Sequence, residues 1–217
     1  SPTWIEEIVK TYDQFNGEVG GVGGRILSIG ALSTPKSNRG KPPGLWTNLL
    51  RRVSNVVVRD SQYQSVGVVC RSGELIGNFD RKLTTVIKVE HIQGCNMSFR
   101  SQIIKKVGLF DEAYAFTSFR NESDFCLRVR KAGYRLLYNS NAVVFHQGLS
   151  PHISQPIGQN IRKKHSYNAK NDIYFVLKNR KIIPNFALLR FFVKIFLSVE
   201  QSLRFALRRR DLSYLSI

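Results

Sequence analysis

The sequence predicts a mixed α/β fold. Segments in which apolar residues recur at helical spacing alternate with short extended segments, and no internal repeat is present. The chain of 217 residues is long enough to form one large domain or two small ones. Its hydrophobic content of 42% and charged content of 22% are those of an ordinary folded protein, which excludes wholesale disorder and a collagen-like structure.

The first thirty residues predict one helix followed by one strand. Apolar residues at helical spacing favour a helix over residues 3–15, and Gly17 ends it. Residues 18–29 are typical of a strand whose start is crowded with glycines. The run GGVGG at 20–24 opens a strand and not a helix, so we interpret these glycines as sites of close packing; phosphate binding is the less favoured alternative.

The middle of the chain predicts a hairpin, a strand and a short helix. The pattern indicates a hairpin over residues 66–79, with its turn at Gly73. A further strand is expected over residues 83–93. A helix is expected over residues 100–107, with Gly108 at its C-cap.

The best-marked helix covers residues 121–132. Asn121 is expected to cap it, and Gly133 ends it. Asp124 occupies the position at which a capping-box carboxylate accepts a hydrogen bond from the backbone N–H of Asn121. Arg128 lies four residues after Asp124, so the two side chains could also form an ion pair. Two extended segments follow, at residues 134–138 and 142–145.

The net charge indicates the kind of partner that the protein binds, and the cysteine content indicates its cellular compartment. The chain carries 33 Lys and Arg against 15 Asp and Glu, and the net charge of +18 predicts attraction to an anionic partner. The three cysteines are odd in number and widely spaced, which is typical neither of a disulfide framework nor of a zinc site and indicates a reducing compartment.

Residues 151–217 are expected to form a basic linker followed by an amphipathic helix over residues 185–210. A narrow basic stripe runs along this helix, and apolar side chains cover most of the rest. Two roles are open: the helix lies on an anionic membrane surface, or its apolar face packs on the protein core or on a partner subunit. The residues expected at this contact are Arg190, Phe192, Lys194, Phe196, Arg204, Arg208, Arg209 and Arg210.

The basic charge also raises nucleic-acid binding as an alternative. The sequence contains no helix-turn-helix, zinc finger, RNP-like aromatic strand or KH-like GxxG loop. The basic residues of the C-terminal helix share it with a wide apolar face, unlike those of a solvated recognition helix. Binding to a specific nucleic acid is therefore disfavoured.

Four motifs occur in order between residues 94 and 148. They are GCNMSFR (94–100), VGLFDE (107–112), NESDFCLRVRKAGYRL (121–136) and AVVFHQG (142–148). This succession resembles the acceptor-side half of family 2 glycosyltransferases of the GT-A fold, over about residues 1–148. The resemblance implies that residues 1–150 are the acceptor-side half of a Rossmann-like catalytic domain.

One departure from the family is that the sequence contains no Asp-x-Asp motif. In the family this motif precedes the region of resemblance and holds a divalent metal on the donor diphosphate. We therefore expect a partial GT-A fold that lacks the N-terminal nucleotide-binding half and is inactive by itself. The resemblance implies Mn²⁺ or Mg²⁺ as cofactor, with His146 as one ligand; a histidine at the sheet rim without a ligand role is the equal alternative.

The resemblance implies that Glu122 is the general base. It stands at the position of the family's catalytic Asp and would take the proton of an acceptor hydroxyl as that oxygen attacks the anomeric carbon. The alternative is an acidic residue that merely favours the first turn of a helix. Further residues are implied at the acceptor site, each with a turn or cap as its structural alternative: Gly94, Asn96, Met97, Asp111, Glu112 and Asp124.

The resemblance thus implies an inverting, metal-dependent glycosyltransferase of cell-envelope polysaccharide synthesis. Its partners would be a nucleotide-sugar donor, a glycan or lipid-linked acceptor, and an anionic membrane surface. The expected location is cytoplasmic, peripheral on the inner face of the cell membrane. A non-catalytic carbohydrate-binding remnant is the main alternative, and assembly into a homo-oligomer is left open.

Overall fold

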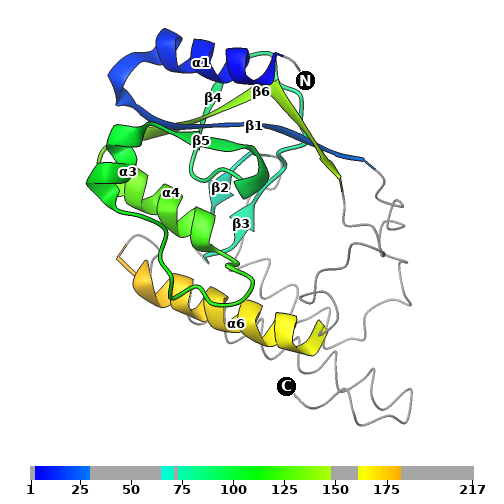
Figure 1. Cartoon of the computed structure of the whole chain (residues 1–217), viewed down its shortest axis with the longest axis vertical. Helices are drawn as coiled ribbons and strands as arrows, with labels where there is room; N and C mark the ends of the chain where they lie inside the picture. The colour runs from blue at the N-terminus through cyan, green and yellow to red at the C-terminus, as the bar shows by residue number, and fades with distance from the viewer. Residues whose placement is uncertain (1–2, 30–64, 71–72, 148–160, 182–217) are drawn as a thin grey trace.

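The computed structural model describes residues 3–29, 65–70, 73–147 and 161–181. These residues form a mixed α/β structure around a four-stranded sheet with helices on both faces (Figure 1), which confirms the predicted class. The two central strands are parallel, and each outer strand is antiparallel to its neighbour. In sheet order the strands are β4 (Ile87–Val89), β6 (Arg135–Gln147), β1 (Val19–Ile29) and β5 (Met97–Phe99).

Helix α1 (Trp4–Phe15) covers one face of the sheet and connects to β1 through a short 3-10 turn. Its buried Ile8 packs with Val22 of β1 and with Leu137 and Ala142 of β6. The N-terminal helix and strand predicted from the sequence are therefore confirmed.

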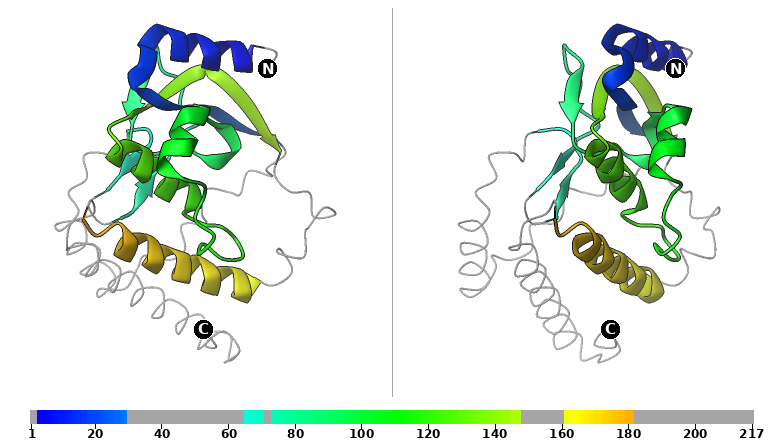
Figure 2. Two further views of the ribbon diagram at one scale, coloured as in Figure 1. Left: turned by 60° about the vertical axis from the view of Figure 1, so that its left-hand side comes forward. Right: turned by 90° about the vertical axis from the view of Figure 1, so that its left-hand side faces the viewer.

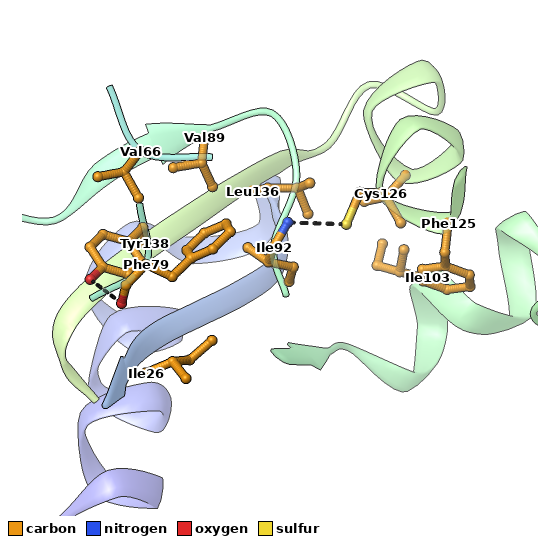
Figure 3. Close-up of a cluster of buried hydrophobic side chains, with 11 residues drawn as sticks. Ile26, Val66, Phe79, Val89, Ile92, Ile103, Phe125, Cys126, Leu136 and Tyr138 are labelled. Carbon is orange, nitrogen blue, oxygen red and sulfur yellow. Dashed lines mark hydrogen bonds between the residues drawn. The ribbon is translucent and has the colours of Figure 1, made fainter. Parts of the chain in front are cut away.

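The opposite face of the sheet carries the main core (Figure 3). Helices α3 (Ser101–Val107) and α4 (Asn121–Lys131) pack on it, together with a small antiparallel hairpin of β2 (Val68–Val69) and β3 (Leu75–Ile76). Leu136 and Tyr138 of β6 point into this core, while Leu137 between them points to α1, because side chains alternate along a strand. The predicted hairpin and the helix ended by Gly108 are confirmed.

The glycines of β1 allow neighbouring chain segments to approach its backbone. A Cβ atom at Gly24 would lie 2.0 Å from the carbonyl oxygen of Ala142 and 2.5 Å from Nδ2 of Asn96, distances that no side chain can tolerate. The other glycines of the run are packed almost as closely, at positions 20, 21 and 23. The interpretation of GGVGG as sites of close packing is confirmed.

Helix α6 (Ile161–Lys178) lies against the outer side of α4 (Figure 2). Phe175 and Val176 of α6 pack with Leu127 of α4 and with Tyr114 of the preceding loop. Residues 161–178 lie in the segment expected to be a basic linker and amphipathic helical extension; they are helical and contribute buried side chains. The predicted C-terminal helix over residues 185–210 lies outside the described residues.

Two further predictions differ from the structure. The strand expected over residues 83–93 is only three residues long, at β4, because the chain on either side of it leaves the sheet. The two extended segments expected before His146 form one strand, β6, whose pairing with β1 is interrupted by a shift in register after Asn139. Among the described residues, no helix is both long and apolar enough to cross a bilayer.

Buried His91 makes the stability of the fold depend on pH. Burial lowers the pKa of its imidazole to about 4, and the ring, packed edge-on against Phe79, lies with Nε2 3.1 Å from the carbonyl oxygen of Ile76. Because the unfolded chain binds this proton near pH 6.5, the free energy of unfolding falls as the pH decreases from 6.5 to 4. We expect the free energy of unfolding to fall by on the order of 2–3 kcal/mol less in His91→Gln than in the wild type when the pH is lowered from 7.5 to 4.5. Urea unfolding at both pH values measures this difference. An equal loss in both proteins would contradict this assignment.

Candidate functional site at the start of helix α4

Glu122 lies in the first turn of α4, and its side chain lies directly on the backbone of Gly94. A Cβ atom at Gly94 would be 2.5 Å from Oε1 of Glu122 and 3.1 Å from its Cγ. The absence of a side chain at Gly94 therefore provides the space that Glu122 occupies. Glu122 is half-buried. Two of the four motifs of the sequence meet at this point.

The negative charge of Glu122 acts on two neighbouring thiols. Burial and, to a smaller extent, the Glu122 carboxylate raise the pKa of Cys95, which lies next to Gly94. The same two causes raise the pKa of Cys126 to about 12, opposed by the hydrogen bond that its Sγ accepts from the N–H of Ile92 (Figure 3). Both cysteines are therefore thiols at neutral pH, and neither is an activated nucleophile.

The start of α4 differs from the prediction. The N-cap is Arg120, with a left-handed φ of 76°, and Asn121 is the first helical residue. The N–H of Asn121 donates to the carbonyl of Ser118 at 3.0 Å, so it does not bind the Asp124 carboxylate. The predicted cap at Asn121 and the predicted capping box are wrong, because the loop enters the helix one residue earlier than the cap signal indicates.

Helix α6 holds the loop that leads into α4. Three residues of this loop have positive φ, which is costly without a glycine: Phe116, Ser118 and Arg120. The guanidinium of Arg120 is buried and forms an ion pair with Asp172 of α6. Thr117 donates to Oδ1 of Asn168 at 2.6 Å, and Asn171 donates to a loop carbonyl at 3.1 Å. Contacts from α6 thus offset the loop strain and position the helix end that carries Glu122.

Asp124 faces the interior of the protein. Its carboxylate is 0% exposed and accepts hydrogen bonds from Arg128 at 3.1 Å, Lys178 at 2.8 Å and Asn179 at 3.1 Å. The predicted ion pair with Arg128 is confirmed. The carboxylate of Asp124 is thus held by Arg128 of α4 and by residues at the end of α6, and its expected place at the acceptor site stays a prediction.

Asp111 is part of the same network. It accepts hydrogen bonds from Lys178 at 2.6 Å, from the hydroxyl of Tyr174 at 2.9 Å and from the N–H of Ala113 at 2.9 Å. These hydrogen bonds, led by that from Lys178, lower the pKa of Asp111 to about 2. The bond to Ala113 makes Asp111 the turn-forming residue that was the structural alternative. Glu112 next to it is exposed.

Asn96 is buried next to the site and holds neighbouring chain segments together. Its side chain is 1% exposed, accepts a hydrogen bond from the indole of Trp4 at 2.8 Å and donates to the carbonyls of Arg25 and Ala142, both at 2.9 Å. The Asn96 amide therefore joins α1, β1 and β6, and its expected role in binding sugar hydroxyls stays a prediction. Met97 is half-buried and packs on the main core.

His146 lies near the end of β6, opposite Ser28 of β1, and is exposed. Within the part of the chain that the structure describes, no three His, Cys, Asp or Glu side chains lie close enough together to hold a metal ion. The described residues therefore do not form a Mn²⁺ or Mg²⁺ site by themselves, and His146 is an isolated donor among them.

The structure brings Gly94 and Glu122 together. Neither residue takes part in the hydrogen-bond network of Asp111 and Asp124. Sequence reasoning missed Arg120, Asp172 and Lys178, whose partners lie more than fifty residues away in the chain and leave no local pattern. Comparison of the chain with protein-family models, with curated proteins and with solved structures gave no match.

The Asp124 network generates a stability prediction. Asp124→Asn leaves Arg128 and Lys178 with a neutral partner, and we expect it to lower the free energy of unfolding by about 3 kcal/mol, as measured by urea titration. The control Asp13→Asn, on the exposed side of α1, should change it by less than ~0.5 kcal/mol. Equal effects of the two substitutions would show that the buried ion pairs do not hold α6 on α4.

Proposed function

We propose that this chain is the acceptor-side half of an inverting glycosyltransferase with a GT-A fold, and that Glu122 is its general base. The observation that carries the proposal is the position of the Glu122 side chain on Gly94. The resemblance relates Glu122 to the family's catalytic Asp and Gly94 to the floor between donor and acceptor, although 28 positions separate them in the sequence. If Glu122 only favoured the first turn of the helix, a glycine at position 94 would not be required.

The chemistry that this arrangement supports is proton abstraction from a sugar alcohol. A carboxylate in the first turn of a helix is favoured in its charged form by the helix dipole, and a base must be charged to accept a proton. The acceptor oxygen would form a bond to the anomeric carbon while the bond from that carbon to the donor diphosphate breaks, and its proton would pass to Glu122. A donor-binding part and a divalent metal are implied by the resemblance alone.

The proposal includes a peripheral position on the inner face of the cell membrane, where a lipid-linked or envelope acceptor would be met. The net charge of +18 supports it, because anionic headgroups attract such a chain. The finding that no described helix crosses a bilayer is compatible with this position.

Substitution of Glu122 tests the proposal. In the protein that carries this chain, Glu122→Gln should lower the rate of sugar transfer at least ~10²-fold and leave nucleotide affinity unchanged, because the amide keeps the shape of the side chain but cannot accept the proton. The measurement is release of nucleoside diphosphate from a panel of nucleotide-sugars, with nucleotide affinity measured by calorimetry.

The matched control is Glu6→Gln, an exposed acid of α1, which should transfer sugar at the wild-type rate. Turnover of Glu122→Gln at the wild-type rate would remove Glu122 as the base. Glycan binding without turnover of any donor, even in the protein with an Asp-x-Asp region, would favour the carbohydrate-binding alternative instead.

A further inference from the structure

A basic groove lies where the end of α4 meets the end of α6. Figures 1 and 2 show these two helices side by side. Its volume is about 420 Å³, and its apolar lining comes from Leu127 and Leu177. Five of the side chains that line it are cations, and none is an acid. The cations are Arg128, Lys131, Lys178, Arg180 and Lys181.

Ion pairs neutralise only part of this charge. Arg128 and Lys178 both bind Asp124, which lies beneath the groove, and Lys178 also binds Asp111. Lys131, Arg180 and Lys181 are exposed, and no carboxylate among the described residues pairs with them. Three cations at the opening therefore have no carboxylate partner within the part of the chain that the structure describes.

The helix dipoles compensate only part of the positive charge that the ion pairs leave. The C-termini of α4 and α6 both end near the groove, and each provides about half a negative charge. With the two carboxylates, this balances about three of the five positive charges. Among the described residues, about two positive charges of the groove remain uncompensated, and a bound anion would lower their mutual repulsion.

We propose that this groove binds the phosphate groups of an anionic ligand. Lysine ammonium groups and arginine guanidinium groups are the side chains that bind phosphate most strongly, the arginines through paired N–H donors. The groove is a concave site with converging cations, which suits a phosphate or diphosphate better than an extended strand. The ligand is a soluble phosphorylated compound or the headgroup of a membrane lipid. This inference is independent of the role proposed for Glu122.

The experiment compares two triple variants of equal charge. The groove variant carries Lys131→Gln, Arg180→Gln and Lys181→Gln, all at exposed positions. The control variant changes three exposed lysines of α1, β4 and the loop before β4: Lys10→Gln, Lys82→Gln and Lys88→Gln. Binding of inorganic pyrophosphate is measured by calorimetry at low ionic strength, and binding to phosphatidylglycerol vesicles by sedimentation, with thermal melts to confirm that each variant folds.

We expect the groove variant to bind at least one of the two probes ~10-fold more weakly than the control variant, with affinity falling as salt is added. A difference with pyrophosphate identifies a soluble ligand, and a difference with vesicles alone identifies a lipid headgroup. Equal losses in the two variants would mean that binding follows total charge, and no loss in either would mean that the groove binds no phosphate. Each of these last two results overturns the proposal.

Discussion

The close contact between Gly24 and Asn96 is the constraint on which the fold and the site both depend. Only a glycine lets the backbone of β1 come within reach of the Asn96 amide, which then binds α1, β1 and β6 at once. Gly94 lies two residues before Asn96, so the same contact fixes the backbone on which Glu122 lies. The geometry of the site thus follows from a packing requirement deep in the sheet.

Helix α6 gives α4 its fixed position. Just before α4 the Arg120–Asp172 pair holds the loop, and in the first turn of α4 Asp124 binds both Lys178 and Asn179. A single packing arrangement satisfies the buried Asp124 carboxylate and its three donors. One helix therefore carries the candidate base at its beginning and part of the basic groove toward its end, and α6 stabilises both.

Local signals in the sequence predicted local structure well. The helix at 3–15, the glycine-rich strand, the hairpin and the helix ended by Gly108 all follow from periodicity and turn residues. The same signals misplaced the cap of α4, and they did not reveal which parts of the protein bind the side chains of Asn96 and Asp124. Their partners come from α1, β6 and α6, and no spacing rule relates residues so far apart.

The substitution Gly94→Ala measures most directly whether the position of Glu122 on Gly94 matters. The added methyl group would displace the flexible carboxylate end, so we expect sugar transfer to fall by about 10²-fold while the free energy of unfolding changes by less than ~1 kcal/mol. Gly17→Ala, where a Cβ atom meets nothing within 4 Å, is the control that should keep full transfer. Undiminished transfer by the Gly94→Ala protein would contradict the account.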